Sequence, residues 1–247
     1  MAASQSPLPE DEARSHPAPN HRFYAVAHKA GNNLTSLERA LEVGADAIEC
    51  DFWHYHGRLA LRHERKLPAL PVLYDRWYIR WSWGVLGLRE LLRAINMRTE
   101  LFLDIKSSTP RAADAVLELY HDNAAMMPVT RVSSHRWDLL DRLGRSGTAM
   151  RMYYSVKNRS GLAALYRRVE QPYPPVGVSI RHTLLTAAEI ERLHECNLDV
   201  FAWTVNNPHR GEELVQWGVD GIIADNLEVL RLATPLAHDK TNGSQRA

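Results

Sequence analysis

The sequence predicts an α/β fold, a single (β/α)₈ TIM barrel with a short hairpin and a Trp-rich insertion after the second strand. Eight short apolar segments alternate with amphipathic helical patterns, and 247 residues suit one such barrel. Segments that are apolar on both faces indicate parallel strands covered by helices. A doubly wound open sheet is the alternative, but the count of eight and the absence of a Gly-rich loop after the first segment favour the barrel.

The order of the elements follows from the hydrophobic periodicity. The expected strands are 23–28, 46–52, 100–106, 129–134, 149–155, 175–180, 198–204 and 220–226. The clearest helical patterns cover 34–44, 88–95, 111–123, 186–196 and 210–218. Gly44 and Gly218 stand where glycine ends helices, and Thr186 stands at an N-cap position. Only the second unit departs from this rhythm, with a hairpin at 58–63 and a Pro- and Trp-rich stretch at 66–87.

Composition sets the limits for partners and compartment. The formal net charge is +1, so no global field points to nucleic acid or an anionic membrane, and any anionic ligand needs a local site. Cys50 and Cys196 are far apart in sequence, which does not indicate a disulfide framework and fits a reducing compartment. We therefore expect a cytoplasmic protein that does not bind nucleic acid.

Both ends of the chain differ from the rest. Residues 1–20 contain Pro, Ser and acids without the apolar run of a secretory signal, so we expect a disordered N-terminal arm. Residues 233–247 look similar and are expected to form a disordered tail. The barrel domain is thus expected over 21–232.

Polar residues gather where the expected strands end, which is where barrel enzymes place their chemistry. These residues are His28 after the first strand, Glu49 and Asp51 on the second, His63 after the hairpin, Asp104 and Lys106 on the third, and Trp203 near the end of the seventh.

Three of these residues predict a metal site. Glu49 and Asp51 are two apart on a strand and point to the same face, whereas Cys50 points towards the helices. Acids converging inside a barrel repel one another unless a cation neutralises them. With Asp104 the shell is all oxygen, which suits Mg²⁺ or Ca²⁺ better than zinc. The alternative is that these acids pair with Arg or Lys, or lie at the rim.

Two histidines flank the proposed carboxylates. His28 and His63 have side chains that exchange protons near neutral pH, and acid–base catalysis needs one proton accepted and one donated. The remaining histidines are expected to have packing roles. This group includes His54, His56, His135, His182 and His194.

The ordered motifs resemble those of the glycerophosphodiester phosphodiesterases, from residue 23 to residue 232. The motifs are AHKAGNN (27–33), GADAIECD (44–51), LRHE (61–64), LFLDIK (101–106), WTVNN (203–207) and GVDGIIADN (218–226). The resemblance implies hydrolysis of a glycerophosphodiester or lysophospholipid on a barrel with one divalent cation. It implies that the metal ligands are Glu49, Asp51 and Asp104, that the acid and base are His28 and His63, and that Lys29, Lys106 and Trp203 contact the substrate.

The chain departs from the family pattern in its first loop. Lys29 replaces the family's arginine, so a point charge replaces a bidentate fork. Gly31 stands where the family has a glutamate, and Asp104 stands where it has a longer acid. The short loop and the Leu-Asp-x-Lys strand also look similar to secreted sphingomyelinases D, which are phospholipase D-like enzymes. That activity, or a catalytically silent phosphodiester-binding barrel, is the alternative.

The Trp-rich segment 75–84 lies close to His63 in sequence. Trp77, Trp81 and Trp83 occupy odd positions and would share one side of an extended segment. Near the barrel mouth they would contact a membrane surface or a choline group. The alternative is that they seal the end of the barrel as core residues.

Overall fold

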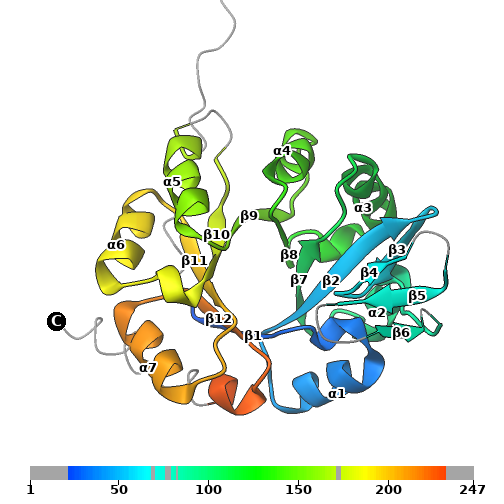
Figure 1. Cartoon of the computed structure of the whole chain (residues 1–247), viewed down its shortest axis with the longest axis horizontal. Coiled ribbons are helices and arrows are strands. Elements are labelled where there is room, and N and C mark those ends of the chain that lie inside the picture. The colour runs from blue at the N-terminus through cyan, green and yellow to red at the C-terminus, as the bar shows by residue number, and fades with distance from the viewer. Residues whose placement is uncertain (1–21, 68–69, 76–78, 82, 171–173, 232–247) are drawn as a thin grey trace, which may run out of the picture.

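The chain forms a closed barrel of eight parallel strands with helices around the outside (Figure 1). The computed structural model describes residues 22–67, 70–75, 79–81, 83–170 and 174–231. The predicted N-terminal arm (1–20), the predicted tail (233–247) and Trp77 lie outside these residues. The barrel closes because β1 pairs in parallel with both β2 and β12. The predicted TIM barrel is thus confirmed.

The strands agree with the sequence prediction to within a few residues. The barrel strands are β1 (Tyr24–Ala27), β2 (Ala47–Tyr55), β7 (Glu100–Ile105), β8 (Thr130–Ser134), β9 (Arg151–Val156), β10 (Gly177–Arg181), β11 (Asp199–Trp203) and β12 (Gly221–Ala224). The helices are α1 (Leu34–Glu42), α2 (Leu88–Ile95), α3 (Arg111–His121), α4 (Trp137–Arg145), α5 (Arg159–Arg168), α6 (Ala187–Glu195) and α7 (Pro208–Trp217). Short 3₁₀ helices cover Ala30–Asn32, Ala124–Met126 and His182–Leu184.

Local sequence signals explain several helix ends. The Thr186 side chain accepts a hydrogen bond from the Glu189 amide as the N-cap of α6, and Gly218 ends α7 with φ of 90°. Both roles were predicted. The helices α4 and α5 were not singled out from the sequence, although Leu139, Leu140 and Leu143 of α4 repeat at helical spacing.

The second strand continues beyond the barrel and folds back. β2 pairs antiparallel with β3 (Arg58–Leu61), as the predicted hairpin requires. His56 and Gly57 form the turn with φ of 47° and 73°, the left-handed conformations of a tight two-residue hairpin. The following stretch, described from the sequence only as Pro- and Trp-rich, contains a three-stranded antiparallel sheet. Its strands are β4 (Arg65–Lys66), β5 (Val72–Tyr74) and β6 (Ile79–Trp81).

The core has an inner and an outer layer. Inside the barrel, Phe102, Tyr153 and Phe201 pack with ring centroids 5.2–5.5 Å apart. Cys50 belongs to the outer layer, as predicted. A Cβ atom at Gly31 would lie 2.7 Å from the Cys50 Cβ and 3.1 Å from Leu91 Cδ2, so the loop after β1 packs here only with glycine. The aromatic layer fills the barrel interior below the polar strand ends.

Among the helices of the described residues, none combines the length and hydrophobicity needed to cross a bilayer.

Candidate active site

Strand register brings the three predicted acids together. β2 and β7 are parallel neighbours in which Asp51 stands opposite Asp104 and Glu49 stands opposite Phe102. Each of the three residues offers a carboxylate oxygen, and these oxygens all lie within 4.8 Å of one another. All three side chains are buried. The sequence prediction of a converging carboxylate cluster therefore agrees with the geometry.

Nearby donors hold the cluster in place. The Lys29 amide donates to Glu49 Oε2 at 2.6 Å. Asn32 Nδ2 donates to Asp51 Oδ2, and the Asp51 amide donates to Asn32 Oδ1, both at 3.0 Å. These bonds tie the short loop after β1 to the carboxylates of β2.

Lys106 is the ammonium group within the cluster. Its Nζ donates to Asp104 and lies 2.9 Å from Asp51 Oδ1. The contact with Asp51 is an ion pair without hydrogen-bond geometry, so the buried Oδ1 atom has no hydrogen-bond partner among the described residues. One ammonium group thus faces three carboxyl groups.

The charge imbalance appears in the pKa values. Burial, with the neighbouring Asp51 charge, raises the pKa of Glu49 to about 8. Burial also favours the neutral form of Asp51, but the Lys106 charge outweighs it and lowers the Asp51 pKa. The carboxylates overcome the burial of Lys106 and raise its pKa. Without a further cation, Glu49 therefore holds a proton near neutral pH.

The donor set fits a hard divalent cation. Mg²⁺ and Ca²⁺ take oxygen ligands at about 2.0–2.6 Å, so the oxygens around one ion lie within about 5 Å of one another. Glu49, Asp51 and Asp104 meet this requirement, and the raised pKa of Glu49, with one ammonium group among three carboxyl groups, indicates a site with too little positive charge.

His28 lies beside a carboxylate that the barrel closure supplies. β1 pairs with β12, so His28 and Asp225 follow neighbouring strand ends. His28 Nδ1 lies 2.7 Å from Asp225 Oδ1, and Asn206 Nδ2 holds the other oxygen of Asp225 at 2.9 Å. Burial alone would lower the His28 pKa, but the Asp225 hydrogen bond and the Glu49 charge outweigh it, so the pKa is raised. The same bond lowers the pKa of Asp225 to about 2.

His63 has a similar partner from the insertion. Its Nδ1 lies 3.2 Å from Asp75 Oδ2, and Asp75 follows β5 of the small sheet. The Arg62 amide donates to the Asp51 carbonyl at 2.9 Å, which anchors this segment to β2. In both histidines a carboxylate engages Nδ1, which leaves Nε2 for proton exchange.

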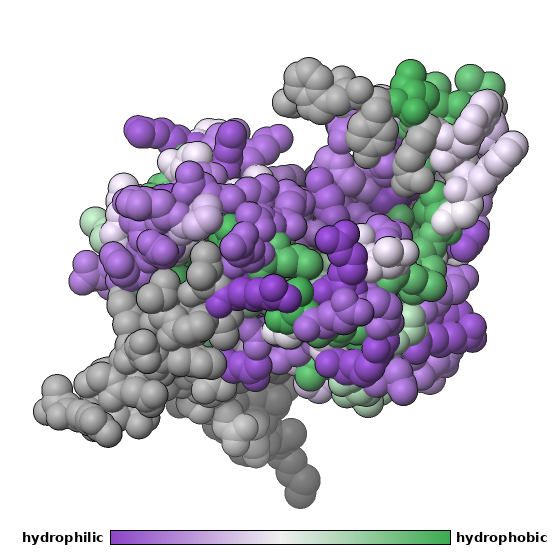
Figure 2. Space-filling model, turned by 90° about the horizontal axis from the view of Figure 1, so that it is seen from below, coloured by the Kyte–Doolittle hydropathy of each residue, from purple (hydrophilic) through white to green (hydrophobic). Residues whose placement is uncertain are grey.

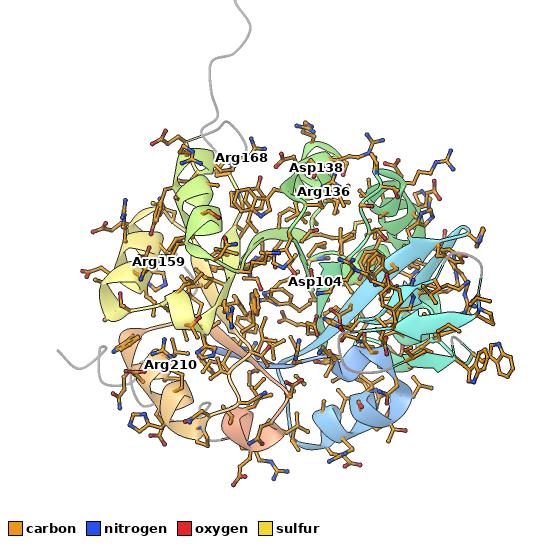
Figure 3. The ribbon with its side chains drawn as sticks, viewed as in Figure 1. Asp104, Arg136, Asp138, Arg159, Arg168 and Arg210 are labelled. Carbon is orange, nitrogen blue, oxygen red and sulfur yellow. The ribbon has the colours of Figure 1, made fainter. Side chains whose placement is uncertain are left out.

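One cavity of about 260 Å³ joins these groups at the barrel mouth. Asp104 projects into the middle of the ring of strands in Figure 3. Asp51 is fully buried and, unlike the other seven predicted residues, is not among the cavity-lining residues. The predicted residues that line the cavity are His28, Lys29, Glu49, His63, Asp104, Lys106 and Trp203.

Sequence reasoning missed three further residues. Asp225 and Asp75 orient the two histidines, and His135 lines the cavity although it was assigned a packing role. For Asp225 a signal was present, because an acid directly after the last strand of a closed barrel lies beside the end of the first strand. His135 also directly follows a strand, β8.

The His28–Asp225 pair generates a prediction that needs no substrate. Replacing Asp225 by Asn removes one of the two charges that favour the imidazolium, so the His28 pKa should fall. An NMR titration of the histidine ring protons with excess chelator measures this. Asp220→Asn is the matched control, because Asp220 lies 2.9 Å from Nε2 of a different histidine, His194. An unchanged His28 pKa in Asp225→Asn would contradict the prediction.

The raised His28 pKa also has a consequence for stability. A raised folded-state pKa contributes stability at pH values below the unfolded pKa, and this stability is lost as pH rises through the folded pKa. The lowered Asp225 pKa contributes stability that is lost as pH falls towards 2. Asp225→Asn should therefore cost most stability in the weakly acidic range between these limits, as measured by thermal unfolding.

Solved structures share this fold. A glycerophosphodiester phosphodiesterase from Thermotoga maritima superposes with a TM-score of 0.67 at 20% identity, over 85% of this chain and 97% of that chain. One from Parabacteroides distasonis gives a TM-score of 0.68 at 18% identity, over 89% and 98%. An Oleispira antarctica phosphodiesterase in complex with the product sn-glycerol-3-phosphate gives 0.66 at 16% identity, over 90% and 99%.

Sequence comparison agrees with the fold. The Bacillus subtilis (strain 168) protein "Putative glycerophosphodiester phosphodiesterase YhdW" is 44% identical over 48 residues, which span 19% of this chain and only 20% of that relative. The model of the glycerophosphoryl diester phosphodiesterase family matches residues 105–229, or 125 of 247 residues. The match includes Lys106 and Trp203 and begins directly after Asp104. The chain therefore belongs to the glycerophosphoryl diester phosphodiesterase family.

Proposed function

We propose that this protein hydrolyses the phosphodiester bond of glycerophosphodiesters or lysophospholipids, with one Mg²⁺ or Ca²⁺ ion at Glu49, Asp51 and Asp104. The observation that carries the proposal is one cavity lined by two carboxylate-paired histidines and by Glu49 and Asp104, two members of the buried carboxylate cluster. Family membership supports the reaction class. The relative bound to sn-glycerol-3-phosphate supports a glycerol phosphate moiety in the substrate.

In this proposal the lysines position the substrate phosphate. Lys29 and Lys106 both line the cavity, and Lys106 would exchange its carboxylate partners for a phosphate oxygen once a divalent ion neutralises them. A bound ion supplies positive charge against the negative charge that develops on the phosphate. Trp203 forms part of the same wall.

The two histidines would move the protons. One Nε2 accepts a proton from the attacking water or substrate hydroxyl, and the other protonates the leaving alcohol. The carboxylates on Nδ1 fix the ring orientation and stabilise the imidazolium that forms, so Asp225 and Asp75 are positioning residues.

Replacing either histidine tests the acid–base pair. His28→Ala and His63→Ala should each lower kcat by roughly 10²–10⁴-fold on glycerophosphodiesters, because each removes one proton transfer. His54→Ala and His182→Ala are matched controls, since neither residue is among the described residues that line the cavity. Circular dichroism checks that the variants are folded. Near-normal turnover in both His28→Ala and His63→Ala would refute the assignment.

Metal removal tests the carboxylate site. Excess chelator should abolish turnover, and Mg²⁺ or Ca²⁺ should restore it, because three buried carboxylates lose their main source of positive charge. Addition of the ion should also raise Tm in the wild type but not in Asp104→Asn. Full turnover of the metal-free protein would exclude the proposed cofactor.

We also propose a cytoplasmic, peripheral contact with a lipid surface. Cys50 and Cys196 are free thiols, which fits a reducing compartment.

Trp81 and Trp83 are 60% and 75% exposed, and their rings stack at a centroid distance of 5.6 Å. Ile79 beside them is 74% exposed. Apolar and near-neutral residues gather on the corner of the molecule at the side of the small sheet (Figure 2), a typical pattern for interfacial anchoring. The predicted third member, Trp77, lies outside the described residues.

Vesicle binding tests the lipid contact. Trp81→Ala and Trp83→Ala should each weaken sedimentation with phosphatidylcholine vesicles several-fold, because each removes exposed aromatic area from the contact. Leu34→Ala is the matched control, as Leu34 is a 49% exposed apolar residue that begins α1 and does not belong to the small sheet. Equal sedimentation of wild type and both tryptophan variants would overturn this proposal.

A further inference from the structure

A second, larger hollow opens from the catalytic cavity. It is a groove of about 900 Å³, and it shares His63, Lys106, His135 and Trp203 with the cavity. His63 is one of the proposed proton-transfer groups, so the groove begins at the reacting end of the cavity. A substituent on the phosphodiester that does not fit into the smaller cavity would extend into this groove.

Positive side chains outnumber negative ones along the groove. Among its lining residues, the cations are Arg65, Lys106, Arg136 and Lys157, and the acid is Asp75. Asp75 faces His63, so it is already engaged. The positive side chains of the groove would therefore repel a cationic group of a ligand.

Two of the four cations have acidic partners. Lys106 is paired with Asp51 and Asp104. Arg136 binds Asp138 through two bonds of 2.8 and 2.9 Å, and both side chains project together from the start of α4 in Figure 3. Arg136 is thus neutralised by Asp138, and Lys106 is already assigned to the diester phosphate.

The other two cations have no such partner. Arg65 and Lys157 are exposed, and no ion pair to either is found within the part of the chain that the structure describes. They come from separate elements, Arg65 from β4 of the small sheet and Lys157 from directly after β9. Two uncompensated cations from separate elements on one groove make a local anion-attracting field in a chain of net charge +1.

Two tryptophans that line the groove have hydrogen-bond donors without partners in the described part of the chain. The indole N–H groups of Trp53 and Trp203 are buried and have no hydrogen-bond partner among the described residues. Both tryptophans line the groove, and an indole N–H donates but cannot accept. Two tryptophans of the groove wall therefore carry donors without acceptors in this part of the chain, although their N–H atoms are themselves buried.

We propose that this groove is a subsite for a second anionic group of the substrate, a phosphate monoester on the alcohol of a glycerophosphodiester. This specificity rests on the proposed function. Arg65 and Lys157 would contact the second phosphate while the diester phosphate occupies the cavity. Substrates with a choline or ethanolamine group lack the anion and place a cation beside these side chains.

The test compares a substrate that carries the second phosphate with one that lacks it. With metal present and at low ionic strength, kcat/KM should be about 10-fold higher for glycerophosphoglycerol carrying a terminal phosphate than for glycerophosphoglycerol, and higher still relative to glycerophosphocholine. At about 0.5 M salt the preference should largely disappear, because exposed charges are screened. Equal values for the two glycerol compounds at low salt would overturn the subsite.

Variants that each remove one positive charge show which side chains cause the preference for the phosphorylated compound. Lys157→Gln and Arg65→Gln should each reduce the preference about 3-fold, with little change for unphosphorylated glycerophosphoglycerol. Arg159→Gln and Lys66→Gln are matched controls close in sequence. Arg159 is exposed and Lys66 lies over the Tyr55 ring at 4.2 Å, and neither belongs to the groove lining. A preference reduced equally by the controls would assign it to net charge and refute the subsite.

A binding measurement separates the subsite from the proposed reaction. Isothermal titration of the wild-type protein in excess chelator should give tighter binding of the phosphorylated compound than of glycerophosphoglycerol, and Lys157→Gln should narrow this difference about 3-fold. If no compound is cleaved but this difference persists, the proposed function fails and the subsite stands. If cleavage occurs but binding shows no difference, the subsite fails and the function stands.

Discussion

The burial of three carboxylates at one end of a closed barrel is the constraint on which the rest of this site depends. Parallel register places Asp51 beside Asp104, and the two-residue period of a strand places Glu49 on the same face. The aromatic layer of Phe102, Tyr153 and Phe201 closes the barrel interior beneath them. With little solvent to screen them, the carboxylates must be balanced by fixed positive charge and donors. Lys106, Asn32 and the Lys29 amide meet part of that demand.

The histidines show how one barrel supports similar pairs in different environments. His28 receives Asp225 through strand closure and lies deep in the site, whereas His63 receives Asp75 from an inserted sheet and is more exposed. The first pair depends on the barrel itself. The second depends on the insertion, so the same segment that carries Trp81 and Trp83 also orients a proposed catalytic group. Changes in the insertion would therefore affect both surface contacts and catalysis.

The sequence was most informative where one local rule decides the outcome. Apolar segments predicted the strands, and their polar ends predicted Glu49, Asp51 and Asp104 as neighbours, because register in a parallel barrel follows from strand order. The histidine partners were harder to predict, since Asp225 and Asp75 reach the site only through ring closure and through a small sheet. The strands of that sheet have two or three residues, too few for a periodicity to be recognised. The role of His135 depends on the shape of the cavity, which no spacing along the chain encodes.

Gly31 connects the outer packing of the barrel to the chemistry of its first loop. The loop passes so close to β2 that its backbone touches the Cys50 side chain, and the adjacent Asn32 can then bridge Asp51. The position at which the family resemblance places a glutamate is therefore used for close backbone approach in this chain. A carboxylate could enter the site from this loop only through added residues that lift the backbone away from β2, because any side chain at position 31 would push against the strand that carries Glu49 and Asp51. Loop length, rather than residue identity at one position, thus sets the number of acidic groups that this active site can present.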